Sequence, residues 1–306
     1  MRKRKSTRQA PDNARQAPLF ANLPDIVPPE ARIRRPDNPV WTENKARLIA
    51  RYLYYFVLIT KHGTYIDGFA GPQEPEKPQM WAAKLVLESE PKWLRHFHLF
   101  DGDRHQAQRL RELKKSMEAK EGEEKREINV YHSDFNNRVR GVLRSDLIGP
   151  NEAVFCLLDQ RTFECKWSTV RLLAEFKEKP KNKIELFYFL GIGWLKRAIS
   201  GVRKESLLRD WWGREDWPEL RRWSEEKILN ELVSRFKAEL GYASVKPWPI
   251  FDRRRGGGVM YYMIHATDHP EAPALMSRAY ARAVRPKESM EQLRLELDSN
   301  QSAKKP

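Results

Sequence analysis

The chain has 306 residues, which is enough to bury the core of one large α/β domain. Lys and Arg total 57 against 42 Asp and Glu, and this net charge of +15 favours a polyanionic partner, with nucleic acid the first candidate. Two cysteines are too few for a disulfide framework or a four-cysteine zinc site, and no apolar run reaches the roughly 18 residues of a membrane span. We therefore expect a cytoplasmic protein that is neither exported nor inserted in a membrane.

The first element in chain order is a predicted flexible basic arm, residues 1–39, in which Pro, Arg and Asn occur without an apolar period. Residues 1–36 hold nine basic and three acidic side chains, yet residues 37–306 keep an excess of +9. The body of the protein is therefore basic as well. A helix over 43–60 follows, with Thr42 as its expected cap and apolar residues at helical spacing.

Short apolar runs then alternate with amphipathic stretches along the chain. Four runs of strand length lie at 64–68, 96–101, 128–132 and 153–159, and a fifth, KIELFYFL at 183–190, is the most continuously apolar. Buried strands joined by helical crossovers are typical of a parallel sheet. The sequence predicts an α/β domain over 40–290 with a Rossmann-like, doubly wound sheet of about seven strands.

The C-terminal part of this domain begins with a predicted helical insertion at about 200–241. Its four tryptophans either pack a small core or stack on bases, and they are Trp211, Trp212, Trp217 and Trp223. The segment VKPWPIFDRRRGGGVMYYMIHATD then predicts two strands around a basic connection. Arg253, Arg254 and Arg255 in that connection either follow a phosphate backbone or form a solvated hairpin tip. A last helix and a polar tail, 291–306, end the chain.

Acidic residues end each of the first four predicted strands, and they are Asp67, Asp101, Asp134 and Asp159. In an open parallel sheet, ligands bind at the carboxyl ends of the strands, so this regularity predicts a binding site there. No histidine or cysteine cluster has the spacing of metal ligands, so we predict no metal site.

The stretch YIDGFAGPQ, residues 65–73, has the features of a turn that grips a nucleoside cofactor. In this interpretation Asp67 positions the turn, while Gly68, Ala70 and Gly71 let the backbone approach the cofactor closely. Asp101 would hold the ribose and Asp134 the adenine amino group. The alternatives are that the glycines only form a strand-to-helix bend, and that Asp101, Asp103 and Asp134 cap helices.

This order of motifs resembles class I S-adenosylmethionine-dependent methyltransferases, in which a D-x-F-A-G turn follows the first strand and an acid follows the second. A narrower similarity, over residues 41–285, is to the three-Cys-motif partner proteins (TcmP) of bacteria and archaea. The segments that carry it are WTENKARLIARYLYYF, YIDGFAGP, FHLFDGD, LLDQRTFECKWSTVRLLAEF, KIELFYFLGIGWLKRAI and YYMIHATDHPEAPALM. The resemblance implies a methyltransferase-like fold, S-adenosylmethionine as cofactor and a three-Cys-motif protein as partner.

The fourth strand-end turn, Asp159 to Phe163, is where the resemblance places the methyl acceptor, with Asp159 and Phe163 as catalytic residues. Base amino-methyltransferases usually have Asp/Asn-Pro-Pro-aromatic there, whereas this chain has Asp-Gln-Arg-Thr-Phe. Arg161 is predicted to contact phosphate or to pair with Asp159, and Gln73 replaces a usual glycine. The departures leave two functions open: a methyltransferase acting on or with nucleic acid, or a non-catalytic nucleic-acid-binding or scaffold partner that keeps the fold.

Overall fold

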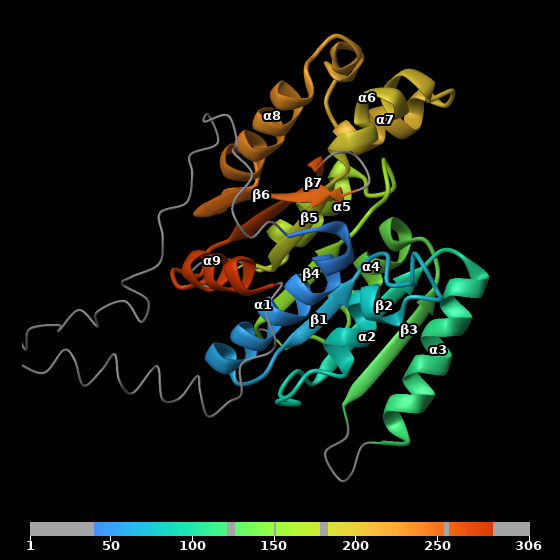
Figure 1. Ribbon diagram of the computed structural model, residues 1–306, viewed down its shortest axis with the longest axis vertical. Coiled ribbons are helices and arrows are strands. Elements are labelled where there is room, and N and C mark those ends of the chain that lie inside the picture. The colour runs from blue at the N-terminus through green and yellow to red at the C-terminus, as the bar shows by residue number, and fades with distance from the viewer. Residues whose placement is uncertain (1–39, 121–125, 150, 178–182, 254–256, 284–306) are drawn as a thin grey trace, which may run out of the picture. The chain divides into compact units, whose positions relative to one another are not determined.

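A computed structural model describes residues 40–120, 126–149, 151–177, 183–253 and 257–283 (Figure 1). The predicted basic arm, the polar tail, and Arg254 and Arg255 lie outside these described residues. Among the helices within them, none is long and apolar enough to cross a membrane.

The described residues form one seven-stranded sheet with the order β3-β2-β1-β4-β5-β7-β6. The strands are β1 Thr64–Asp67, β2 His96–Asp101, β3 Glu127–His132, β4 Val154–Leu158, β5 Glu185–Leu190, β6 Ser244–Asp252 and β7 Gly258–Thr267. Strands β1 to β5 are parallel, and β7 pairs antiparallel with both β5 and β6. This arrangement is class I methyltransferase-like and confirms the predicted fold, including all seven predicted strands.

Both faces of the sheet are buried. Successive residues of a strand point to opposite faces, so neighbouring side chains pack into different cores. Phe155 of β4 and Phe187 of β5 contact Tyr52 of helix α1, Lys45–Thr60. Cys156 and Leu186, the residues adjacent to them in these strands, belong to the core on the other face. Burial on both faces is the reason why these strands are continuously apolar in the sequence.

The remaining helices follow the crossovers of the sheet. Helix α1 contacts α2, Ala82–Leu87, and the last helix α9, Ala272–Arg282. The others are α3 Arg104–Glu118, α4 Phe135–Arg144, α5 Trp167–Glu175, α6 Ile192–Gly201, α7 Glu205–Trp212 and α8 Glu225–Ala238, with short 3₁₀ turns at Thr42–Asn44, Pro78–Met80 and Trp217–Arg221. The predicted cap of α1 was wrong, because a 3₁₀ turn precedes the helix and Asn44, not Thr42, is the N-cap residue.

The predicted helical insertion corresponds to α7, the 3₁₀ turn and α8, between β5 and β6. Trp211 and Trp212 are at most 1% exposed and pack with the apolar side chains of α5 and α8, so these two tryptophans build a core. Trp223 stacks edge-on against Trp212 with ring centroids 5.7 Å apart. The packing alternative is therefore correct for the buried pair.

Candidate functional site

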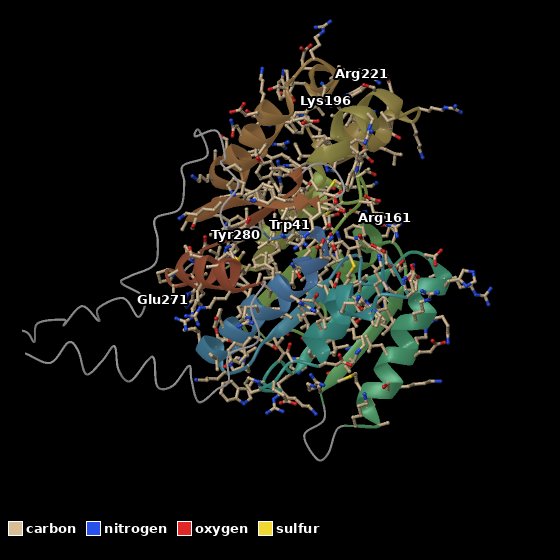
Figure 2. The ribbon with its side chains drawn as sticks, in the orientation of Figure 1. Trp41, Arg161, Lys196, Arg221, Glu271 and Tyr280 are labelled. Atoms are coloured by element: carbon tan, nitrogen blue, oxygen red, sulfur yellow. The ribbon has the colours of Figure 1, made fainter. Side chains whose placement is uncertain are left out.

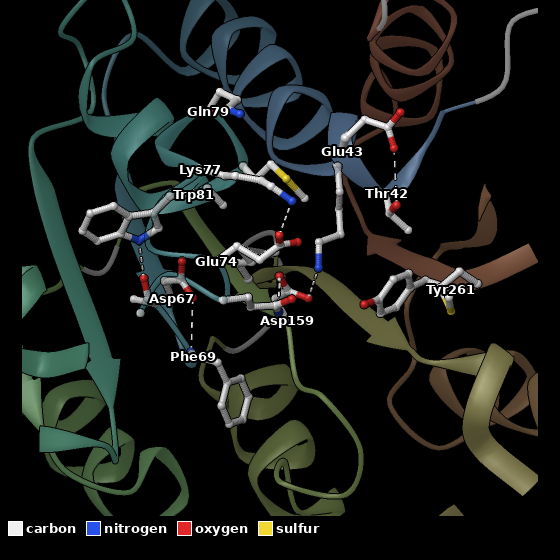
Figure 3. A pocket seen from close by; sticks show the side chains of 18 of the residues that line it. Thr42, Glu43, Asp67, Phe69, Glu74, Lys77, Gln79, Trp81, Asp159 and Tyr261 are labelled. Atoms are coloured by element: carbon white, nitrogen blue, oxygen red, sulfur yellow. Dashed lines mark hydrogen bonds and ion pairs between the residues drawn. The ribbon is translucent and has the colours of Figure 1, made fainter. Parts of the chain in front are cut away.

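A cavity of about 540 Å³ opens at the carboxyl ends of β1 and β4, the point where the strand order reverses (Figure 3). Its volume lies in the range of small-molecule sites, roughly 300–1,000 Å³. The turn after β1 forms one wall with Phe69, Ala70, Gly71 and Gln73. The segment 74–82, the 3₁₀ turn at Thr42–Asn44 with the first residue of α1, the end of β4 and the β6–β7 pair also contribute to the lining. This position is the one at which open α/β sheets bind ligands.

Asp67 ends β1 with its side chain almost fully buried, at 1% exposure. One carboxylate oxygen accepts a hydrogen bond from the Phe69 amide at 3.2 Å, and the other accepts from the Tyr65 hydroxyl at 2.8 Å. Burial raises the pKa of Asp67 to about 7, and the nearby Asp159 contributes to the increase. The carboxyl group therefore changes charge near neutral pH, inside the cavity.

We expect Asp67→Asn to raise the free energy of unfolding by about 1–3 kcal/mol above pH 7. The pKa of Asp67 is raised from 3.8 to about 7 by folding, so the stability that its protonated form contributes is lost as the pH rises through this interval. Asparagine stays neutral and keeps an oxygen for the Phe69 amide. Urea unfolding at several pH values measures the difference, which should vanish near pH 4; a difference independent of pH would contradict the assignment.

Asp101, at the end of β2, fixes the turn after β1. Its carboxylate accepts from the Gly71 amide at 3.0 Å and from the Asp103 amide at 2.8 Å. A Cβ atom on Gly71 would lie 2.4 Å from the Asp101 carboxylate and 2.5 Å from Gln106, so only glycine fits at position 71. Burial raises the pKa of Asp101. The requirement for glycine thus comes from the protein's own packing, and Asp103, not Asp101, caps α3.

Asp159, directly after β4, forms a buried ion pair in the cavity. Lys45 Nζ lies 2.7 Å from one Asp159 oxygen, and Gln73 Nε2 lies 3.4 Å from the other (Figure 3). The ammonium group also lies 4.9 Å from the centre of the Phe189 ring and 4.7 Å from that of Tyr261. Burial lowers the pKa of Lys45, but the attraction and hydrogen bond to Asp159, together with the nearby Tyr261 and Asp67, more than offset this and the pKa is raised. Lys45 therefore carries its charge within the site.

Four of the predicted catalytic and cofactor-binding residues do not line the cavity: Asp101, described above, and Gly68, Asp134 and Phe163. Asp134 is the N-cap of α4 and accepts from the Asn137 amide at 3.1 Å, as the capping alternative predicts. The Gly68 amide donates to the Leu157 carbonyl, and a Cβ at this position would contact the Phe135 ring. Phe163 is 8% exposed and packs edge-on against Trp211, with ring centroids 5.0 Å apart.

Two of the predicted nucleic-acid contacts, Arg161 (Figure 2) and Arg253, have exposed side chains. Arg253 lines the cavity, pairs with Glu43 at 3.1 Å and lies over the Trp41 ring at 4.6 Å. The Arg161 carbonyl accepts from Trp194 Nε1 at 3.1 Å, and the Trp194 ring contacts Tyr261. Arg161 is thereby held near the same opening, and it forms no ion pair with Asp159 among the described residues.

Sequence reasoning missed Lys45, Trp81 and Tyr261. Trp81 Nε1 donates to the Ala70 carbonyl at 2.6 Å and closes the side of the cavity over the turn. A signal for Lys45 existed, because it lies four and seven residues before Ile49 and Tyr52, on the apolar face of the helix. A lysine on such a face needs a buried acidic partner. Among the described residues, no group of three or more His, Cys, Asp and Glu side chains is arranged to hold a metal ion.

No family model and no curated protein matches the sequence, so the three-Cys-motif resemblance stays a prediction. Solved structures with a similar arrangement include protein LPL1258 from Legionella pneumophila, with a TM-score of 0.43, 10% identity, and 80% of this chain and 94% of that chain covered. A putative methyltransferase, yhhF, from Escherichia coli has a TM-score of 0.33, 13% identity, and coverage of 76% and 90%. A putative S-adenosylmethionine-dependent methyltransferase from Methanococcus maripaludis has a TM-score of 0.32, 15% identity, and coverage of 73% and 86%. The fold assignment rests on this chain's own strand order.

Proposed function

We propose that the protein binds S-adenosylmethionine in the cavity beside the 67–71 turn and transfers the methyl group to nucleic acid. The observation that carries this proposal is the open cavity at the reversal of strand order, which holds two buried carboxylates, Asp67 and Asp159. Gln73 and Phe69 line the cavity without filling it.

The residues present suit the chemistry of this cofactor, which carries a sulfonium and an ammonium charge, ribose hydroxyls and an aromatic adenine ring. The Asp67 carboxyl is buried at the turn and favours a cation in its ionised form. Phe69, Met80 and Trp81 supply apolar and aromatic surface in the same cavity. Asp101 holds the turn through Gly71, and its carboxylate is the group we assign to the ribose hydroxyls. When bound, the cofactor would supply the electrophilic methyl group.

The basic charge supports nucleic acid as the substrate. The net charge of the chain is +15. The exposed Arg253 lines the cavity, and the exposed Arg161 is bonded through its carbonyl to Trp194, whose ring contacts the lining residue Tyr261. Guanidinium groups at this place suit the phosphates on either side of a nucleotide that enters the site.

A second candidate, a non-catalytic partner of a three-Cys-motif protein, is favoured by one observation. Both oxygens of Asp159 already have partners within the protein, Lys45 and Gln73. In this alternative the fold serves as a scaffold, and the partner is the one that the sequence resemblance implies. Cofactor binding distinguishes the two candidates.

We expect calorimetric titration to show micromolar binding of S-adenosylmethionine and S-adenosylhomocysteine. Asp101→Ala should weaken both by about 1.5–3 kcal/mol, which is roughly 10- to 150-fold, because a charged hydrogen-bond acceptor is lost. Asp103→Ala is the matched control, since it removes an exposed helix cap two residues away and leaves the Asp101 carboxylate in place. No binding by protein that circular dichroism shows to be folded would exclude the enzyme and favour the scaffold.

A further inference from the structure

The Lys45–Asp159 pair disfavours a cationic acceptor at this end of the cavity. The Lys45 side chain is 8% exposed and its ammonium group lies between the Phe189 and Tyr261 rings, so it has little room to withdraw. An ammonium group that approaches Asp159 would lie close to the positive charge of Lys45. A primary amine of a protein, protonated at neutral pH, is therefore disfavoured.

The turn after Asp159 lacks the groups that recognise the amino group of a flipped base. Such recognition needs free hydrogen-bond acceptors and an aromatic ring for stacking. Gln160 is 1% exposed; its Oε1 accepts from the Cys165 amide and its Nε2 donates to the Phe189 carbonyl. The ring of Phe163 packs against Trp211 instead of the cavity.

Methylation of a base carbon is excluded as well where it requires a temporary covalent bond between the base and a cysteine. The chain has two cysteines, Cys156 and Cys165, and both are fully buried in the core. Neither of them lines the cavity.

A hydroxyl group meets the demands of this site. It is a hydrogen-bond donor without a charge, so it can donate to the Asp159 oxygen that faces Gln73. The hydrogen bond from Gln73 Nε2 to Asp159 is long, at 3.4 Å, so a stronger hydrogen-bond donor can replace it. Lys45 holds the other oxygen of the carboxylate at 2.7 Å and thereby fixes its orientation.

We infer that the acceptor is a ribose 2′-hydroxyl group and that the nucleic acid is RNA, an inference that rests on the proposed methyltransferase function. Asp159 is the catalytic residue that takes the hydroxyl proton, and Lys45 is a positioning residue that acts through Asp159. The hydroxyl oxygen forms the new O–CH3 bond as the S–CH3 bond breaks, and the bonding electrons stay on sulfur. The proton passes from Asp159 to water. DNA lacks the 2′-hydroxyl, and the exposed Arg161 and Arg253 bind the phosphates of either polymer.

The test uses the full-length protein, S-adenosylmethionine with a labelled methyl group, and random-sequence RNA and DNA oligonucleotides of equal length. We expect label in RNA and not in DNA. After alkaline hydrolysis of the RNA, the label should remain in dinucleotides, because a 2′-O-methyl group blocks cleavage at that ribose. Asp159→Asn should slow transfer about 100-fold or more while the cofactor titration stays unchanged. Lys45→Met should slow transfer as well, and Lys45→Arg should restore most of it because a cation again orients the carboxylate.

The outcomes separate this inference from the function on which it rests. No cofactor binding overturns the methyltransferase proposal itself. Cofactor binding with label in DNA, in an amino group of a base or in protein overturns the hydroxyl assignment, and so does the absence of label from both polymers. A second readout needs no turnover: with S-adenosylhomocysteine bound, fluorescence anisotropy should show tighter binding of RNA than of 2′-O-methylated RNA of the same sequence.

Discussion

Replacing Lys45 by methionine is expected to lower the free energy of unfolding by about 3 kcal/mol or more. The substitution keeps the apolar stem of the side chain but leaves the Asp159 carboxylate, only 9% exposed, without its cation. A buried charge that has lost its partner typically costs 3–5 kcal/mol. Urea denaturation at pH 7, followed by circular dichroism, measures the change.

The control for this prediction is the double variant Lys45→Met with Asp159→Leu. Because neither side chain then carries a charge, we expect the double variant to be more stable than Lys45→Met alone, and near the wild-type protein. The single variants and the double variant complete a thermodynamic cycle. Additive effects would contradict the prediction, since they would mean that the two side chains contribute independently despite the 2.7 Å contact.

Arg235→Ala is the second substitution with a large expected effect, a loss of about 3–5 kcal/mol. Arg235 is 1% exposed, and its guanidinium group lies 3.9 Å from the centre of the Trp167 ring and 4.8 Å from that of Trp212. It donates to the Trp212 carbonyl at 2.6 Å and pairs with Glu239 at 2.9 Å. Alanine removes the packing between two tryptophans as well as these polar contacts.

The matched control is Arg222→Ala, in the same helical region. The Arg222 side chain is 81% exposed and pairs with Glu219 at 3.2 Å, so its removal should change stability by less than about 0.5 kcal/mol. Thermal unfolding of both variants gives the comparison. Tryptophan fluorescence should also shift to longer wavelength in Arg235→Ala, where water reaches Trp167 and Trp212. Equal effects of the two substitutions would show that burial of Arg235 is not important for stability.

The fold was predictable because its signals are local. Buried parallel strands such as 154–158 are short apolar runs, and the acids after β1, β2 and β4 mark their carboxyl ends in the sequence itself. The strand limits agree within two residues because turns and charges end these runs abruptly. The order of the strands follows less directly, since it depends on packing between distant segments.

The site was less predictable because it depends on contacts between distant residues. Lys45 and Asp159 are 114 positions apart, and nothing near either residue shows that they meet. Acids of similar local appearance have different roles: Asp67 lines the cavity, Asp101 holds the Gly71 amide, and Asp134 caps α4. The role of each depends on the direction of its side chain, which the type of residue at a strand end does not determine.

The contact between the first and last parts of the domain has a consequence for its synthesis. The Val40 carbonyl accepts from the Phe251 amide at 2.9 Å, and α1 packs against α9 (Figure 1). A ribosome therefore makes α1 more than 200 residues before the partner that covers it, at 272–282. Until then the side of α1 that carries Tyr55, which contacts Arg278 of α9, stays open to water, to neighbouring chains and to chaperones. The last helix thus completes the burial of the first.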